Sequence, residues 1–381
     1  MKRSFSCRVL PLLGAVGLLA GAIGCSGESS PTTADGRTKL KVAYLGLTCE
    51  APMFVAQEKG FYTEEGLDVE LVKTDWDGLR EGLGTGSFDA NHTLIMYLLK
   101  PIEQGVDMKI TGGIHTGCLR LQVAANSDIK SPAELKGKKI GVATHIGSPP
   151  YLFSCRVLAA HGIDPRPESD DVQWIPYPPA ELGLAVEKGL VDAVCTSDPI
   201  GTILVGKGIV RTIADQATDA PYSEEYCCAA VVSGKLARAN PAAAAKVTRA
   251  FLKASRWVEE NTIAAATLAV EKNYIAASTE INAQAISQLK YMPGVSSCRQ
   301  SIENAASEMK RAGLLKESTN VDELTKRAWL DLEGVTDEWI NQLEVEKIAD
   351  GGRAPKLSPE GFVALFELNK DCLCCCRCCI E

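Results

Sequence analysis

The chain has 381 residues, of which 46% are hydrophobic, and its formal net charge at pH 7 is −8. This is enough apolar material for one large core or two lobes, and the negative charge argues against a nucleic-acid partner. Beyond the N-terminal segment, no stretch of the sequence is long and apolar enough to be expected to cross a membrane.

The N-terminus has the layout of a secretory signal. Basic residues come first, at Lys2, Arg3 and Arg8, and an apolar run then ends at Ala22-Ile23-Gly24-Cys25. We predict a signal peptide over residues 1–24. The last four residues resemble a bacterial lipobox, which predicts lipidation of Cys25; plain secretion with cleavage nearby is the alternative. Residues 25–38 are polar and are predicted to form a flexible tether.

The stretch Val42–Val72 predicts a strand, a polar turn, a helix and a second strand. Pro52 falls in the first helical turn, where its missing N–H costs little. In open α/β sheets, ligands bind where such a turn opens a helix N-terminus beside a cleft. The turn carries a thiol, Cys49, and a carboxylate, Glu50, which makes it a candidate binding segment.

The rest of the chain alternates between strand and helix patterns up to about residue 240 and is then almost wholly helical. Strands are expected at Lys39–Leu45, Asp68–Val72, Phe88–Asn91, Met108–Thr111, Leu121–Ala124, Lys139–Ala143, Val172–Ile175, Asp192–Thr196, Val210–Ile213 and Ala229–Val232. Helices are expected at Pro132–Leu135, Tyr151–His161, Pro179–Lys188 and Asn240–Asn261. The alternation predicts an α/β fold with parallel sheets covered by helices on both faces.

A series of short motifs gives a more specific prediction. Their order includes Ala56-x-Glu58-Lys59-Gly60-Phe61, Gly66-Leu67-Asp68-Val69-Glu70, Gly86-x-x-Asp89-Ala90, Leu135-Lys136-Gly137-Lys138-Lys139 and Gly189-x-Val191-Asp192-Ala193. Over residues 38–345 this order resembles the solute-binding proteins of nitrate/sulfonate/taurine-type ABC importers. Within that group, Trp76, His92 and Cys195 resemble the pattern of the nitrate- and bicarbonate-binding lipoproteins.

The resemblance implies a two-lobed periplasmic-binding-protein fold of type II with a helix-rich C-terminal region. One lobe would comprise residues 38–120 and 225–345, the other residues 121–224, and residues 346–381 would form a C-terminal extension. The lobes would close on a small ligand and present a docking face to an ABC permease and its ATPase. The implied protein is a monomer, not an enzyme, and stands in the periplasm or on the outer face of the membrane, held there by a lipid anchor.

The expected binding cleft departs from the anion-binding pattern. In the nitrate-type proteins, the position of Cys49 is usually an acid and that of Cys118 usually a glutamine. A histidine usually falls near Pro150 and a lysine near Glu225. The cleft has therefore lost groups that suit an oxyanion, which wants donors and positive charge, and has gained thiols and a carboxylate.

Thiols and imidazoles recur near the ends of predicted strands, where they would line the cleft. The candidate ligand-binding residues are Cys49, Trp76, His92, Cys118, His145, Cys195, Glu225 and Cys227. Trp76 would form an apolar wall, Glu225 would offset cationic charge, and Cys49 and Cys118 would bind a soft metal ion such as zinc or copper, or a complex of one. Three alternatives stay open: a small oxyanion or organic anion such as nitrate, bicarbonate or a sulfonate; a neutral pyrimidine-type vitamin precursor; and an enzyme or sensor built on the same fold.

Other cysteines and histidines have simpler interpretations. Cys155 lies in an apolar helix and is expected in the core, and His161 is expected at the C-terminus of that helix. His115 is left open between a ligand and a structural role. Only one of the neighbours Cys227 and Cys228 is expected to face the cleft, because strand side chains alternate. Cys298 is expected in a loop, where a disulfide is an option in an oxidising compartment.

The C-terminal tail holds six thiols in eight positions. They are Cys372, Cys374, Cys375, Cys376, Cys378 and Cys379. So many neighbouring cysteines cannot easily pair with one another, because short loops strain a disulfide. The tail therefore predicts thiolate capture of a soft metal; a terminus without a role and intermolecular bridging are the alternatives.

Overall fold

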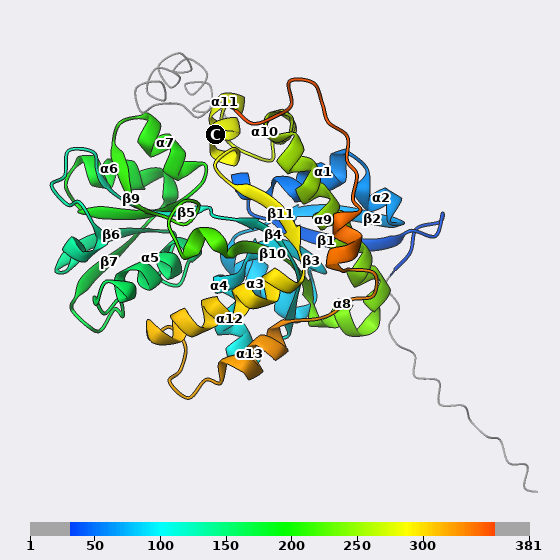
Figure 1. Cartoon of the computed structure of the whole chain (residues 1–381), viewed down its shortest axis with the longest axis horizontal. Coiled ribbons are helices and arrows are strands. Elements are labelled where there is room, and N and C mark those ends of the chain that lie inside the picture. Colours follow the sequence, from blue (N-terminus) through cyan, green and yellow to red (C-terminus); the bar gives the residue numbers. More distant parts are fainter. Residues whose placement is uncertain (1–30, 355–381) are drawn as a thin grey trace, which may run out of the picture.

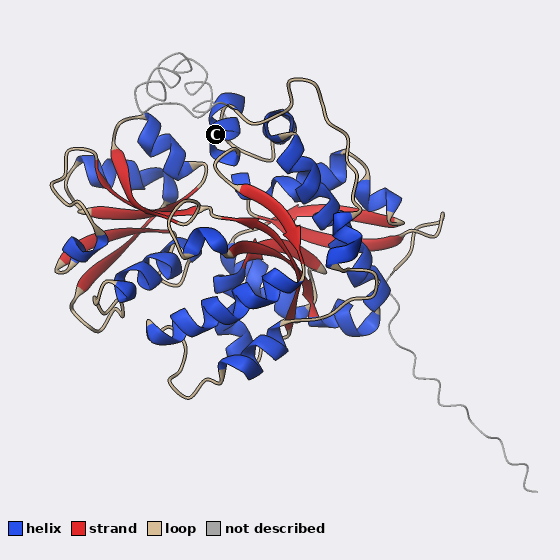
Figure 2. Ribbon diagram, viewed as in Figure 1, coloured by secondary structure: helices blue, strands red, loops and turns tan. Residues whose placement is uncertain are grey.

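The computed structural model describes residues 31–354, in two lobes that each contain one sheet with helices around it (Figures 1 and 2). The predicted signal peptide, Cys25 and the cysteine-rich tail lie outside the described residues. Both lobes mix strands and helices, and the predicted two-lobed α/β fold is confirmed.

The larger lobe is built on a six-stranded sheet. Its strands in spatial order are β11 (Lys290–Gly294), β4 (Met108–Thr116), β10 (Tyr226–Ser233), β3 (Ala90–Leu94), β1 (Thr38–Tyr44) and β2 (Leu67–Lys73). Strands β1, β2 and β3 run parallel, whereas β10 pairs antiparallel with both β3 and β4. The central strand β10 is buried along its whole length, which suits its apolar run Ala229–Val232.

The smaller lobe is built on a five-stranded sheet. Its strands in spatial order are β7 (Val172–Tyr177), β6 (Lys138–Ala143), β8 (Ala193–Ser197), β5 (Leu119–Ala124) and β9 (Val210–Asp215). Strand β6 runs parallel to both β7 and β8, whereas β5 runs antiparallel to its two neighbours.

Helices cover both sheets. In the larger lobe, α1 and α9 pack together on one side of the sheet, while α4, α12 and α13 pack on the other (Figure 1). The helices of this lobe are α1 (Ala51–Glu58), α2 (Phe61–Glu64), α3 (Trp76–Thr85), α4 (Ile95–Glu103), α8 (Gly234–Ala239), α9 (Pro241–Glu260), α10 (Thr262–Glu271), α11 (Thr279–Ile286), α12 (Ser296–Arg311), α13 (Val321–Ala328) and α14 (Asp337–Asn341). Those of the smaller lobe are α5 (Pro149–Ala160), α6 (Leu182–Glu187) and α7 (Ile200–Gly206). Single 3₁₀ turns are η1 (Thr48–Glu50), η2 (Pro132–Leu135), η3 (Pro179–Glu181) and η4 (Tyr222–Glu224).

Two short segments carry the chain between the sheets. The first, residues 117–118, joins β4 to β5, and the second, residues 216–225, joins β9 to β10. They approach closely, because a Cβ on Gly117 would lie 2.5 Å from Cα of Ala217. Gly117 also has a φ of +70°, which side-chain-bearing residues rarely adopt. The two crossings are therefore packed against each other and hold the lobes together. Residues 121–224 as the smaller lobe stay a prediction, although the strand order agrees with it.

Two sequence predictions about the fold are wrong in detail. Both sheets are mixed and not parallel, because β10 and β5 each follow a crossing and return against their neighbours. The described region after residue 240 is almost wholly helical, as predicted, and its one strand, β11, pairs with the outer edge of β4. Its sequence Lys290–Gly294 holds a proline and lysine, which strand patterns disfavour and edge strands tolerate. Cys298 is not in a loop, since it is buried within α12.

Candidate functional site

The two lobes meet around a small enclosed cavity of about 70 Å³. The larger lobe contributes Leu47 and Trp76, and the smaller lobe contributes loops that follow its strands. The lining from the smaller lobe is Ala143, Thr144, Pro150, Pro179, Leu182, Thr196, Ser197, Asp198, Pro199 and Ile200. Most of these residues are apolar, and the polar ones are Thr144, Thr196, Ser197 and Asp198.

Trp76 forms part of the cavity wall. It is the first residue of α3, where the carboxylate of Asp75 accepts a hydrogen bond from the backbone N–H of Gly78 and caps the helix. The Tyr97 ring lies edge-on to the indole at 4.9 Å, and the Tyr97 hydroxyl donates to the Trp76 carbonyl at 2.7 Å. The side chain is thus held in place beside the cavity, as expected for an apolar wall. Its contact with a ligand stays a prediction.

Six sulfur- and nitrogen-bearing side chains converge where the larger lobe meets the two crossings. We call this set the thiol–imidazole cluster, and its members are Cys49, Cys118, Cys227, Cys228, His92 and His115. Each is at most 3% exposed. In two triads the ligand atoms all lie within 4.8 Å of one another, and the triads share Cys228: one adds Cys49 and Cys118, the other His92 and His115. Cys227 joins through its sulfur, 2.9 Å from that of Cys118 and 3.8 Å from that of Cys228.

The topology explains why residues so far apart in sequence meet. Strands β1, β3 and β4 run parallel, so their carboxyl ends lie on the same side of the sheet. The antiparallel β10 begins on that side. Cys49 follows β1 in η1, His92 lies in β3, and His115 lies near the end of β4. In the ladders of β10, Cys228 is opposite both Leu94 and His115.

Cys227 and Cys228 both belong to the cluster. The sequence predicted that only one of the two side chains would face the binding cleft. The reason for the difference is an irregularity of β10. Its pairing with β4 shifts register between Tyr226 and Cys228 and again between Cys228 and Ala229. Such a bulge breaks the alternation of side chains that a regular strand imposes. Sequence reasoning therefore missed Cys228, the residue that both triads share.

Burial shapes the proton affinities of the cluster. It raises the pKa of the Cys118 thiol to about 12 and that of Cys228 well above its usual value. Burial opposes ionisation of Cys227 as well, but hydrogen bonds from Cys118 and Cys228 hold its pKa below the usual thiol value. Burial, with the neighbouring His115, holds the pKa of His92 well below its ordinary value. The imidazole of His92 is therefore neutral and keeps a lone pair at neutral pH.

The two histidines lack partners for most of their ring nitrogens. Neither nitrogen of His92 has a hydrogen-bond partner, nor does Nε2 of His115, although all three atoms are buried. The rings lie 5.1 Å apart at 72°, and the Tyr291 ring lies 5.2 Å from that of His115. A buried polar atom without a partner costs free energy, so these nitrogens are suited to a ligand that the cluster would hold.

Three predicted site residues lie apart from the cluster. His145 is partly exposed in the loop after β6, next to Thr144 of the cavity wall. Cys195 is fully buried in β8 and faces Ser154 of α5. Glu225 is buried in an ion pair with Arg156, 2.8 Å away, so its charge is already compensated. The predictions for Cys155 and His161 are confirmed: Cys155 is core, and the His161 ring contacts the Val157 carbonyl where α5 ends.

Two buried arginines join the lobes near the cluster, and sequence reasoning missed both. Arg120 of β5 forms ion pairs with Asp198 at 2.7 Å and Asp215 at 3.0 Å, and it donates to Gln288 of the larger lobe at 2.9 Å. Arg156 of α5 forms ion pairs with Glu225 and with Glu308 of α12. Nothing in their local sequence distinguishes them from surface arginines, because their acceptors are distant in the chain.

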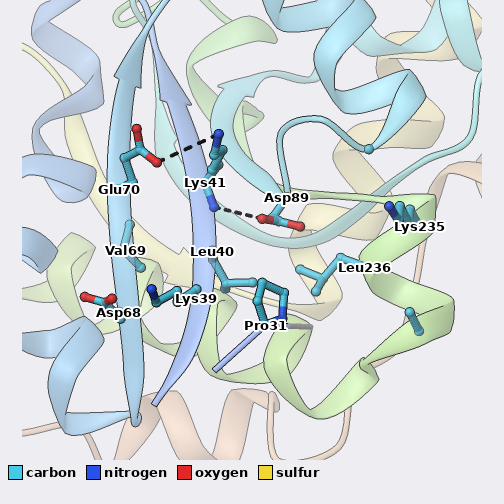
Figure 3. A pocket seen from close by; sticks show the side chains of 12 residues that line it. Pro31, Lys39, Leu40, Lys41, Asp68, Val69, Glu70, Asp89, Lys235 and Leu236 are labelled. Carbon is cyan, nitrogen blue, oxygen red and sulfur yellow. Dashed lines mark hydrogen bonds and ion pairs between the residues drawn. The ribbon is translucent and has the colours of Figure 1, made fainter. Parts of the chain in front are cut away.

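A hollow of about 480 Å³ on the larger lobe is a weaker candidate (Figure 3). It lies over the N-terminal halves of β1 and β2 and the start of α8, away from the carboxyl ends of strands where α/β folds bind ligands. Two of its carboxylates already have partners within the hollow. The Lys41 ammonium lies 3.9 Å from Glu70, and the backbone N–H of Lys41 donates to the Asp89 carboxylate at 2.8 Å. We therefore place the functional site where the lobes meet.

Comparison with known proteins gives consistent results. Residues 33–272 match the sequence model of the NMT1-like family. The nitrate/nitrite binding protein NrtA of Nostoc sp. is 29% identical over 250 residues, which cover 60% of this chain and 51% of that protein. The chain thus spans about half the length of that relative.

Solved structures share the fold. The periplasmic nitrate-binding protein NrtA of Synechocystis superposes with a TM-score of 0.64 at 20% identity, over 87% of this chain and 98% of that one. The alkanesulfonate-binding protein SsuA of Xanthomonas axonopodis, bound to MOPS, gives 0.62 at 19% identity, over 78% and 98%. Among the described residues, no helix is both long and apolar enough to span a bilayer. These matches confirm the resemblance drawn from the sequence.

Proposed function

The chain belongs to the NMT1-like family, and from that premise we propose that it is the extracytoplasmic solute-binding component of an ABC importer. It would bind a small ligand between its lobes and deliver it to a permease and its ATPase. No chemistry on the ligand is proposed.

One observation carries this proposal: two sheet-based lobes, joined by two adjacent crossings, enclose a cavity that both lobes line. A ligand bound there contacts both lobes and therefore stabilises the closed arrangement over the open one. Two hydrogen bonds between the lobes support this arrangement. The backbone N–H of Thr48 donates to the Asp198 carbonyl at 3.3 Å, and Arg120 reaches Gln288.

We also propose that Cys25 carries a lipid anchor that holds the protein outside the cytoplasmic membrane. The lipobox-like sequence that ends at Cys25 supports this, as does the polar stretch that follows it. Expression in a bacterial host followed by mass spectrometry of the N-terminal peptide tests it. Acylation that Cys25→Ser abolishes is the expected result.

The experiment for the main proposal is a ligand screen with two readouts. Nitrate, bicarbonate, methanesulfonate, Zn²⁺ and Cu⁺ are added separately to the reduced protein, followed by thermal unfolding and small-angle X-ray scattering. A true ligand raises the unfolding temperature, because it binds only the folded chain, and lowers the radius of gyration. If no compound produces either change, the proposal is wrong.

A small anion is the alternative ligand, favoured by what the names of the relatives say they bind. The cavity lining includes the hydroxyls of Thr144 and Ser197, whereas the Thr196 hydroxyl already donates to Gln122 Oε1 at 2.7 Å. However, the charged residue among the described lining is Asp198, a carboxylate that repels anions. Arg120, the nearby cation, is already paired with Asp198 and Asp215.

A further inference from the structure

We propose that the thiol–imidazole cluster is a binding site for a soft, thiophilic metal cation and that this cation is the ligand of the protein. The inference rests on the proposed function and names the class of its ligand. It starts from a donor set that the structure brings together: four sulfurs and two imidazoles, with ligand atoms of each triad within 4.8 Å of one another.

The chemistry of the donors selects the cation. Thiolate sulfur and neutral imidazole suit Zn²⁺ and Cu⁺, whereas Mg²⁺ and Ca²⁺ require oxygen ligands. The nearest carboxylate in sequence, Glu50, is not available to a metal. Its oxygens accept hydrogen bonds from the backbone N–H groups of Leu45, Gly46 and Leu47 at 2.8–3.0 Å.

Unmet hydrogen-bonding capacity supplies the second observation. Both ring nitrogens of His92 and Nε2 of His115 are buried without a partner, and the cysteines are free thiols. Buried free cysteines also occur in ordinary cores, but a core that only needed packing would not hold imidazole nitrogens without partners. A bound cation would instead use the nitrogen lone pairs and the sulfurs, and each thiol that binds it would release its proton.

The position of the cluster couples binding to closure of the lobes. Cys118 lies on the first crossing, and Cys227 and Cys228 come directly after the second. Cys49 lies in η1, whose Thr48 N–H contacts the smaller lobe at Asp198. A cation held by Cys49, Cys118 and Cys228 would therefore fix both crossings and the first turn relative to one another, which favours one lobe orientation.

The test first removes the thiols of the tail, which could bind metal themselves, without shortening the chain. In the full-length protein, the six cysteines of the tail are replaced by serine: Cys372, Cys374, Cys375, Cys376, Cys378 and Cys379. This tail-serine protein is reduced, held anaerobically and titrated with Zn²⁺ or Cu⁺ against a chromogenic chelator. Elemental analysis then gives the stoichiometry. We expect about one equivalent of one of the two ions, bound tightly enough to compete with the chelator.

Cys228→Ser in this background is the decisive variant, because both triads share that sulfur. We expect affinity to fall by more than the roughly 10–100-fold that loss of an outer-shell partner costs. Cys298→Ala is the matched control, since Cys298 is equally buried but lies in α12 outside the cluster; its affinity should not change. Near-ultraviolet circular dichroism checks that each variant is folded. If Cys228→Ser does not fold, Cys49→Ser, in the turn η1, takes its place.

Co²⁺ provides a direct readout of the donors. Sulfur-to-cobalt charge-transfer absorption is expected in the tail-serine protein and should weaken in Cys49→Ser. Unchanged metal affinity and an unchanged cobalt spectrum in the cluster variants would overturn the inference. So would a tail-serine protein that binds neither metal but closes on an anion, and that result would leave the proposed function intact. Absence of closure with every compound would overturn both.

Discussion

Two kinds of buried polar group lie where the lobes join, and they differ in how many of their polar atoms have a hydrogen-bond or ion-pair partner. Arg120 and Arg156 each face two carboxylates within 3.0 Å. The thiol–imidazole cluster lies equally deep, yet it contains buried nitrogens without partners and free thiols. Both regions are deeply buried, and they differ in how many polar atoms lack a partner: Asp198 Oδ2 in the Arg120 network, and three imidazole nitrogens in the cluster.

This contrast assigns different roles to the two regions. A buried charge that loses its partner is costly, so the arginine networks matter mainly for the stability and orientation of the lobes. Removing one thiol of the cluster leaves no buried ion pair broken, so the cluster matters mainly for what it binds. Each of the following predictions tests that division.

The largest expected effect is on Arg156. Replacing it by Met leaves the buried Glu225 without its ionic partner and leaves Glu308 with Arg311 alone, and removing one partner of a buried ion pair costs ~3–5 kcal/mol. Urea denaturation followed by circular dichroism measures the change. Arg166→Met is the control, because the exposed Arg166–Asp164 pair lies in the same lobe and exposed pairs contribute little. Equal stability of the two variants would break the comparison.

The effect of Arg156→Met should depend on pH. Burial raises the pKa of Glu225 even though Arg156 lowers it, so removal of Arg156 raises that pKa further. The folded variant then holds more protons than its unfolded form, and its stability falls as pH rises through the window between the unfolded and folded pKa values. We expect the deficit relative to the native chain to grow as the pH rises above the ordinary glutamate pKa and through the raised pKa of Glu225. Denaturation curves across that range would contradict this if the deficit stayed constant or shrank.

Trp76 tests the cavity beside the cluster. Trp76→Ala removes an apolar wall, which should weaken ligand binding by ~1–2 kcal/mol, or about tenfold, for any ligand that fills the cavity. Trp339→Ala is the matched control, since that tryptophan is also partly buried but lies in α14. Titration of the ligand found in the screen, by isothermal calorimetry, gives both affinities. If Trp76→Ala leaves metal binding unchanged while Cys228→Ser abolishes it, the ligand lies in the cluster and not in the cavity.

The smallest expected effect concerns the stability of the metal-free protein. Cys49→Ala removes one buried sulfur and no hydrogen bond on which a charge depends, so it should cost ~1 kcal/mol or less. Thermal unfolding of the reduced protein with a chelator present measures it. A loss as large as that of Arg156→Met would show that the cluster has a structural role after all.

Much of the fold and part of the site could be predicted from the sequence. Apolar runs such as Ala229–Val232 and the strand-turn-helix pattern after Val42 identify elements locally, because strand and helix formation depends on neighbouring residues. The family motifs identified the two-lobed architecture, and the turn after β1 drew attention to Cys49, which the structure places in the cluster. The candidates Cys118, His92 and Cys227 also fell in the cluster that the structure brings together.

The tertiary structure alone decided which candidates meet. Cys195 and Glu225 were predicted to line the same cleft as Cys118, but Cys195 packs against α5 and Glu225 pairs with Arg156. Cys228 lies in the cluster because of the register of β10 against β3 and β4, which the sequence does not show. The physical reason is that distances between residues far apart in the chain follow from strand order, register and the direction of each crossing. The sequence determined which residues carry the chemistry, and the packing of two mixed sheets determined which of them share a site.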